Sequence, residues 1–279
     1  MDDQNPTPPR NVPDLVAHPA GTTPPPPLIP VGPSPIYPKG AEPLGSNTIE
    51  QTPIAGVVGA VEAILRQPRR VIYQLKQPNP GGLIASLLVI AIACSLVYGI
   101  VVGTFSGGDQ LWAAPVKIAA GLLISALICL PSLYIFSCLG GSHARLVEVF
   151  GLVAGLLALM CVMLIGFAPV AWVFSQSTKS LPAMGALHLI FWLVATIFGV
   201  RFVLAGFTHL NAKSDGGLKV WVVIFLLVAL QMTTALRPII GKAPTLLPPA
   251  SQKMFFITHW LNCLQDETTA EGRAPVKSD

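Results

Sequence analysis

The amino-acid sequence predicts an all-α protein: a polytopic membrane helical bundle with five transmembrane helices, interfacial amphipathic helices and a disordered N-terminal arm. Three observations support this fold class. The 279-residue chain is 52% hydrophobic and only 11% charged, whereas a typical soluble domain is about 25% charged. Its apolar segments follow one another between residues 82 and 240, and each approaches the roughly 20 residues that a membrane span needs. The region before them is polar and rich in proline.

Residues 1–51 are predicted to be a disordered, proline-rich cytoplasmic arm. They hold about half of the chain's 27 prolines and cannot bury enough apolar surface to offset the entropy of ordering. They also lack the basic start and apolar core of a secretory signal peptide. The run from Pro24 to Pro27 suits the groove of a proline-recognising module. It equally suits a semi-rigid spacer, which we favour.

Residues 52–76 are predicted to form one basic amphipathic helix in the membrane interface. Thr52 and Pro53 make a good helix start, and apolar residues then recur at helical spacing until Pro68 interrupts the run. The cations interleaved with them are Arg66, Arg69, Arg70 and Lys76. Such a segment beside a span is expected to meet anionic lipid. It is therefore either a topological anchor or a docking surface for lipid or a protein partner.

Five spans are predicted, at residues 82–105, 113–139, 146–174, 182–209 and 218–236. Pro131 should kink the second span, and Lys117 near its start should extend its ammonium group outward. Cations collect before the first span and in the second and fourth connections, so the positive-inside rule places the N-terminus in the cytoplasm and the C-terminus outside. In the tail, residues 238–279, the stretch 254–264 is expected to be a second interfacial helix.

Glycines in two of the spans follow the small-xxx-small spacing that lets helix backbones approach closely. The pairs are Gly99 with Gly103 in the first span, and Gly151 with Gly155 in the third. We expect packing within the chain, with homo-oligomerisation as the alternative.

Polar side chains inside the spans are candidate functional residues, because charge is costly in a bilayer. Arg201 is expected to snorkel toward the cytoplasmic face, or else to pair with Glu148. His188 is expected to be buried and hydrogen-bonded, since a proton relay needs acidic partners within the membrane. At the end of the fifth span, one helix face carries a polar cap made of Gln231, Thr234 and Arg237.

No sequence motif indicates an enzyme. The chain has no phosphate-binding glycine loop, H-E-x-x-H motif, nucleophile elbow or kinase signature, and no C-x-x-C pair. We therefore predict no catalytic residue, cofactor or metal site, and no nucleic-acid partner. The cysteines inside apolar segments should pack as small hydrophobes; they are Cys94, Cys129, Cys138 and Cys161.

Three segments resemble the Yip-domain family of five-span membrane proteins, known as partners of Rab-type GTPases. They are ILRQPRRVIYQL, CLGGSHARLVEVFG, and LIFWLVATIFGV with the following polar turn and GLKVWVVIFLLV, within about residues 60–235. The family usually has a proline soon after the glycine pair, where this chain reads GLVAGLL. The tail resembles those of small uncharacterised bacterial membrane families. The resemblance implies a cytoplasmic N-terminus and a role in membrane organisation or partner binding, but GTPase binding does not carry over because no contact residues match.

These observations favour a non-enzymatic scaffold or adaptor in a bacterial cytoplasmic membrane. Its cytoplasmic arm and basic helix would bind a protein partner or anionic lipid. The alternative is a small transporter or channel. A transport path needs several polar groups converging at mid-membrane depth, and the sequence offers few.

Overall fold

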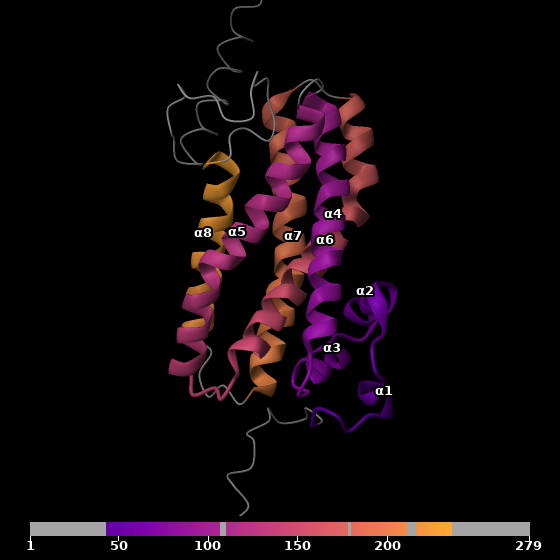
Figure 1. Cartoon of the computed structure of the whole chain (residues 1–279). Coiled ribbons are helices and arrows are strands. Elements are labelled where there is room, and N and C mark those ends of the chain that lie inside the picture. Colours follow the sequence, from indigo (N-terminus) through magenta and orange to yellow (C-terminus); the bar gives the residue numbers. More distant parts are fainter. Residues whose placement is uncertain (1–42, 107–109, 178–179, 211–215, 236–279) are drawn as a thin grey trace, which may run out of the picture. The chain divides into compact units, whose positions relative to one another are not determined.

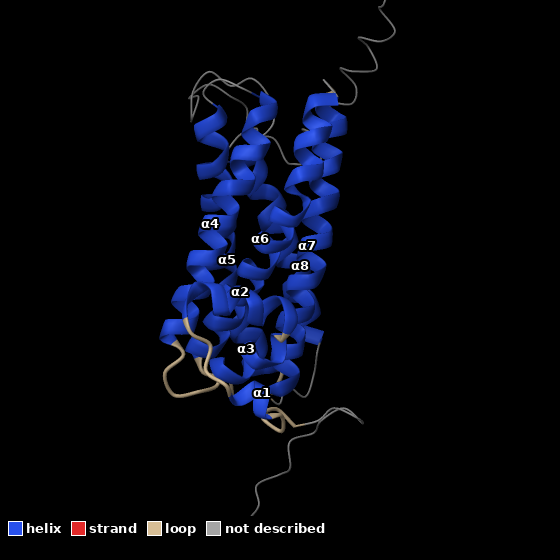
Figure 2. Ribbon diagram, turned by 90° about the vertical axis from the view of Figure 1, so that its right-hand side faces the viewer, coloured by secondary structure: helices blue, strands red, loops and turns tan. Residues whose placement is uncertain are grey.

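The computed structural model describes residues 43–106, 110–177, 180–210 and 216–235. Within these residues the ordered elements are α-helices and no strand occurs (Figures 1 and 2), which confirms the predicted fold class. Three features of the sequence analysis lie outside the described residues: the proline-rich residues 1–42, Arg237 and the predicted tail helix at 254–264.

Among the described residues, four helices are long and apolar enough to cross a membrane, which supports a multi-pass membrane protein. They are α4 (Gly81–Ser106), α5 (Gln110–Leu139), α6 (Leu146–Ser177) and α7 (Leu181–His209). Each begins and ends within about three residues of the predicted span. Apolar length is thus the property that sets these boundaries.

The fifth predicted span corresponds to α8 (Gly216–Ala235). Its described apolar stretch runs from Gly216 to Met232, which is shorter than in the other four helices. The fifth span therefore stays a prediction. The indole of Trp221 fixes this helix to α5, because its Nε1 donates a hydrogen bond of 2.8 Å to the carbonyl oxygen of Cys129.

Helix α6 lies at the centre of the bundle. It packs on α4 and α7, while α4 packs on α5, and α5 on α8. Every residue from Gly151 to Cys161 is buried. All sides of this segment therefore contact protein. It has no outward face of the kind that a peripheral helix exposes, and small and aliphatic residues occur all round it.

The glycines of the predicted packing pairs lie at close contacts within the chain. A Cβ atom on Gly99 would lie 2.3 Å from the Cα of Pro115, so the backbones of α4 and α5 meet there. One on Gly155 would lie 2.4 Å from the ring of Phe202 in α7, and one on Gly151 2.5 Å from Leu75. Gly103 is buried. These contacts confirm the packing role expected of Gly99, Gly151 and Gly155.

The N-terminal region differs from its prediction. Instead of one helix over 52–76, the structure has α2 (Gly56–Arg66) and α3 (Pro68–Leu75), preceded by α1 (Thr48–Gln51). Thr52 does not start a helix: it follows the end of α1, and its hydroxyl donates to the carbonyl of Ile49. Gly56 has a φ of 69°, a left-handed conformation that only glycine adopts readily. Pro68 occupies the first turn of α3, which separates the two helices.

The boundary of the predicted disordered arm is also corrected. Residues 43–51 were assigned to it, yet they contain α1, whose first turn is capped by the side chain of Asn47. We call residues 43–76, with α1, α2 and α3, the headpiece.

Candidate functional site

The headpiece packs on the bundle through apolar side chains. On α2 and α3 the buried residues are Ala60, Ala63, Ile64, Val71, Ile72 and Leu75. They belong to the same core cluster as α4 and α6. The buried faces of both helices therefore contact protein, and only their outer faces remain for other molecules.

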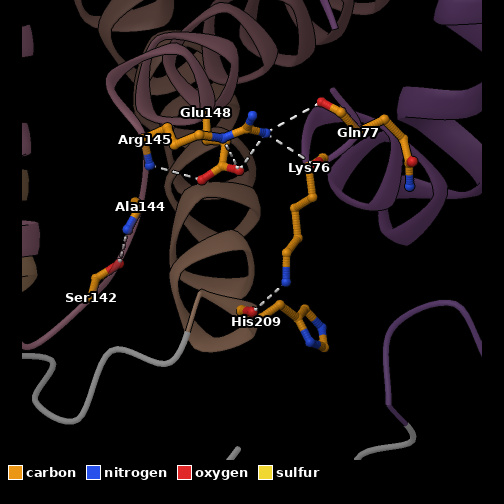
Figure 3. Close-up of polar contacts among 7 residues, drawn as sticks. All are labelled: Lys76, Gln77, Ser142, Ala144, Arg145, Glu148 and His209. Carbon is orange, nitrogen blue, oxygen red and sulfur yellow. Dashed lines mark hydrogen bonds and ion pairs between the residues drawn. The ribbon is translucent and has the colours of Figure 1, made fainter. Parts of the chain in front are cut away.

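Arg145 joins the headpiece to the start of α6 (Figure 3). Its Nε donates to Glu148 Oε1 at 3.0 Å, and its Nη2 donates to the carbonyl oxygens of Lys76 at 3.1 Å and Gln77 at 3.3 Å. The last carbonyls of a helix have no partner within the helix. A guanidinium placed after α3 supplies donors for two carbonyls there.

Glu148 has a second role at the same point, because it caps α6. Its Oε2 accepts the backbone N–H of Arg145 at 2.9 Å, which is one half of a capping box. A carboxylate in the first turn of a helix also interacts favourably with the helix dipole. Glu148 is 7% exposed, so its charge is paired and bonded as burial requires.

The end of α7 is held at the same place. Lys76 Nζ donates to the carbonyl oxygen of His209 at 3.1 Å (Figure 3). In the α5–α6 connection, Ser142 Oγ donates to the carbonyl of Leu210 at 3.2 Å and accepts the N–H of Ala144. The end of α3, the start of α6 and the end of α7 therefore meet in one polar cluster.

A second ion pair orders the outer part of the headpiece. Arg69 Nε lies 2.7 Å from Glu50 Oε1, and the backbone N–H of Gly45 donates to Glu50 Oε2 at 2.6 Å. Burial alone would raise the pKa of the Glu50 carboxyl. The Gly45 N–H, the Arg69 guanidinium and the nearby His209 outweigh this effect and lower the pKa below its ordinary value.

All four cations predicted as a docking surface have partners within the chain. Arg69 pairs with Glu50, Lys76 bonds to His209, and Arg70 donates to the carbonyls of Thr52 and Pro53. Gln74 adds bonds to Thr52 and Ile54. Arg66 is exposed, and its Nη1 lies 3.2 Å from Glu62. These cations therefore mainly hold the headpiece together through contacts within the chain, and are less available to bind lipid or a protein partner.

The proposed pair of Arg201 with Glu148 is wrong. Glu148 pairs with Arg145, and Arg201 is exposed on α7. Glu148 caps its own helix, so its carboxylate is already used.

His188 is hydrogen-bonded, as expected. Its Nδ1 lies 2.6 Å from the hydroxyl of Tyr98, and the two rings meet edge to face. Nε2 of His188 is buried and has no hydrogen-bond partner among the described residues. Sequence reasoning missed Tyr98, because its separation of 90 residues from His188 carries no local signal.

Other predicted polar residues have mixed outcomes. Lys117 was expected to extend outward but is 3% exposed, so it is buried in α5. Gln231 is partly buried in α8. Thr234 lies in the last turn of α8, and its side chain is not among those that the structure describes. Among the predicted packing cysteines, Cys129 and Cys161 are buried, whereas Cys138 is exposed.

Comparisons with protein-family models, curated proteins and solved structures gave no match. The described residues also hold no group of three or more His, Cys, Asp or Glu side chains suited to a metal ion. The functional argument therefore rests on the chain's own geometry.

Proposed function

We propose that this protein is a non-enzymatic membrane scaffold that presents the headpiece to a protein partner at the cytoplasmic face. One observation carries the proposal: Arg145 and Lys76 fasten the headpiece to the start of α6 and the end of α7 by side-chain hydrogen bonds. A helix that served only as a topological anchor would not need this ordered attachment. The resemblance to Yip-domain proteins points to the same class of role.

The orientation is part of the proposal. The end of the bundle that carries the headpiece also carries the cations of residues 66–76, together with Arg145 and Lys219. Cytoplasmic segments are enriched in such residues. The headpiece would then face the cytoplasm, in a bacterial inner membrane.

The outer face of α2 is the surface we assign to the partner. Val58 is 83% exposed, with Val57 and Leu65 also exposed beside it. The Glu62–Arg66 ion pair lies on the same face at helical spacing. An apolar strip with a paired charge is suited to a protein surface. Anionic lipid has less support, because Arg69, Arg70 and Lys76 already bind the chain itself.

The test is affinity purification of the full chain from native membranes in mild detergent. Val58→Asp should lose the partner, because a carboxylate on the apolar strip opposes burial in an interface. Ile49→Asp is the matched control, since Ile49 is 51% exposed on α1 and should leave the partner bound. A chain that starts at residue 43 then tests residues 1–42 separately. Retention of the same proteins by all variants would contradict this surface.

Removing residues 43–76 is not a suitable truncation. It would take Ile64, Ile72 and Leu75 out of the core and leave Arg145 without its carbonyl partners. Loss of a partner from that chain would report unfolding as readily as a binding site.

A transporter or channel is the second candidate, favoured by the Tyr98–His188 pair inside the bundle. The scaffold has more support, because the polar residues Glu148, Arg201 and His188 do not converge. Glu148 caps α6, Arg201 is exposed on α7, and His188 bonds to Tyr98 of α4. Solute or proton flux into liposomes that contain the purified chain, lost in His188→Ala, would favour the transporter.

A further inference from the structure

The outward face of α7 carries a cation on an otherwise apolar strip. Its exposed apolar residues are Ile190, Leu193, Ile197 and Phe198, and Arg201 follows on the same side. The opposite face packs on α6, where Gly199 and Gly206 lie against Leu156 and Leu152. Arg201 forms no ion pair or hydrogen bond with any residue that the structure describes.

The position of Arg201 along α7 sets its depth. Helix α7 has 29 residues, so its length is about 43 Å at 1.5 Å per residue. A hydrocarbon core of about 30 Å leaves about 7 Å of a centred helix outside it at each end. Arg201 precedes the last residue, His209, by eight positions, or about 12 Å. It therefore lies about 5 Å inside the hydrocarbon, on the headpiece side, where an arginine reaches the phosphate level by snorkelling.

Among the residues that the structure describes, no carboxylate pairs with Arg201. Between residues 81 and 209 the only acidic residues are Asp109 and Glu148. Glu148 is bonded to Arg145, and Asp109 lies in the α4–α5 connection, which joins the helix ends opposite the headpiece. Residues 81–209 of a second copy would bring the same two acids, so pairing between the long helices of two copies is not favoured.

We propose that Arg201 binds the phosphate of an anionic phospholipid in the leaflet on the headpiece side. The acyl chains lie along Ile197 and Leu193, which follow Arg201 toward the middle of the bilayer. The order of the strip matches a phospholipid, with charge at the headgroup end and apolar side chains below it. A guanidinium is well suited to phosphate, because it donates two parallel hydrogen bonds. This site is independent of the partner surface on α2.

The experiment measures phospholipid bound to the purified full chain by native mass spectrometry, and its thermal midpoint in mild detergent. Phosphatidylglycerol, phosphatidylcholine and inorganic phosphate are added in parallel. We expect phosphatidylglycerol to bind and raise the midpoint more than either of the others. Arg201→Gln should weaken its binding by about tenfold or more, the effect of losing one charge-assisted hydrogen bond.

Two further variants keep the result interpretable. Arg201→Leu continues the apolar strip and should lose the lipid while leaving the bundle folded. Arg66→Gln, which removes an exposed cation of the headpiece, should leave the lipid bound. The proposal is overturned if both Arg201 variants bind phosphatidylglycerol as the unchanged chain does. It is also overturned if inorganic phosphate raises the midpoint as much as the lipid, which would indicate a simple anion site.

Discussion

Replacing Gly99 by alanine tests the close contact between α4 and α5. The new Cβ would lie 2.3 Å from the Cα and 2.9 Å from the N of Pro115. Carbon atoms normally approach to about 3.5–4.0 Å. Both atoms belong to the backbone of a packed helix, so the helices must separate by about 1 Å or more. Gly166→Ala is the matched control, because nothing lies within 4 Å of its Cβ position in α6.

The two substitutions should change stability in opposite directions. Alanine is favoured over glycine within a helix by about 1 kcal/mol. At Gly166 this gain is unopposed. At Gly99 it is outweighed by overpacking, which costs about 1–3 kcal/mol and belongs at the upper end where backbone must shift. We expect net destabilisation of about 1–2 kcal/mol for Gly99→Ala and stabilisation of up to about 1 kcal/mol for Gly166→Ala.

Thermal unfolding in detergent measures this difference. One kcal/mol corresponds to about 2–4 °C for a chain of this size class, so the two variants should differ by about 2–12 °C. Monodisperse elution of both variants before heating is the control for folding. Equal midpoints for Gly99→Ala and Gly166→Ala would refute the close α4–α5 contact.

Three further predictions concern polar contacts. Arg145→Ala leaves the buried carboxylate of Glu148 without the guanidinium that pairs with it, and the carbonyls of Lys76 and Gln77 without a donor. The headpiece should therefore be destabilised by about 1–3 kcal/mol. The measurement is hydrogen exchange, which should become faster in α3 and stay unchanged in α5. Glu50 has a lowered pKa in the folded chain, so its contribution is present at neutral pH and is lost as the pH falls below about 4.5 through the folded pKa. Protease sensitivity of residues 43–76 should therefore rise on acidification, whereas in Glu50→Gln it should be high already at neutral pH and change less. Trp221→Phe removes the bond to Cys129 and should lower stability by about 1 kcal/mol, whereas an unchanged midpoint would mean that this bond does not fix α8 to α5.

The long apolar helices were predictable because a run of about 20 apolar residues by itself indicates a segment that crosses a membrane. The glycine contacts at Gly99 and Gly155 were predictable for a related reason, since small residues at this spacing serve close packing. Their partners, Pro115 and Phe202, were not. A helix with apolar residues on all sides gives no periodic signal that orients it toward one neighbour.

The polar cluster was only partly predictable. Arg145 and Glu148 are three residues apart and precede an apolar run, so a helix cap was readable from local spacing. The bond from Lys76 to His209 spans 133 positions and depends on how three helix ends meet. The break between α2 and α3 had a visible cause in Pro68, yet the regular apolar spacing favoured one continuous helix. Lys117 was assigned outward by its charge, and packing against neighbouring helices buries it instead.

Site-specific photocrosslinking in native membranes tests the scaffold proposal most directly. A photoreactive amino acid replaces Val58 on the outer face of α2 in one full-length chain and Ile49 on α1 in another. The account predicts a discrete protein adduct from position 58 that is absent from position 49. Lipid adducts alone at position 58, or the same protein adducts at both positions, would contradict the proposal that α2 presents a protein-binding surface.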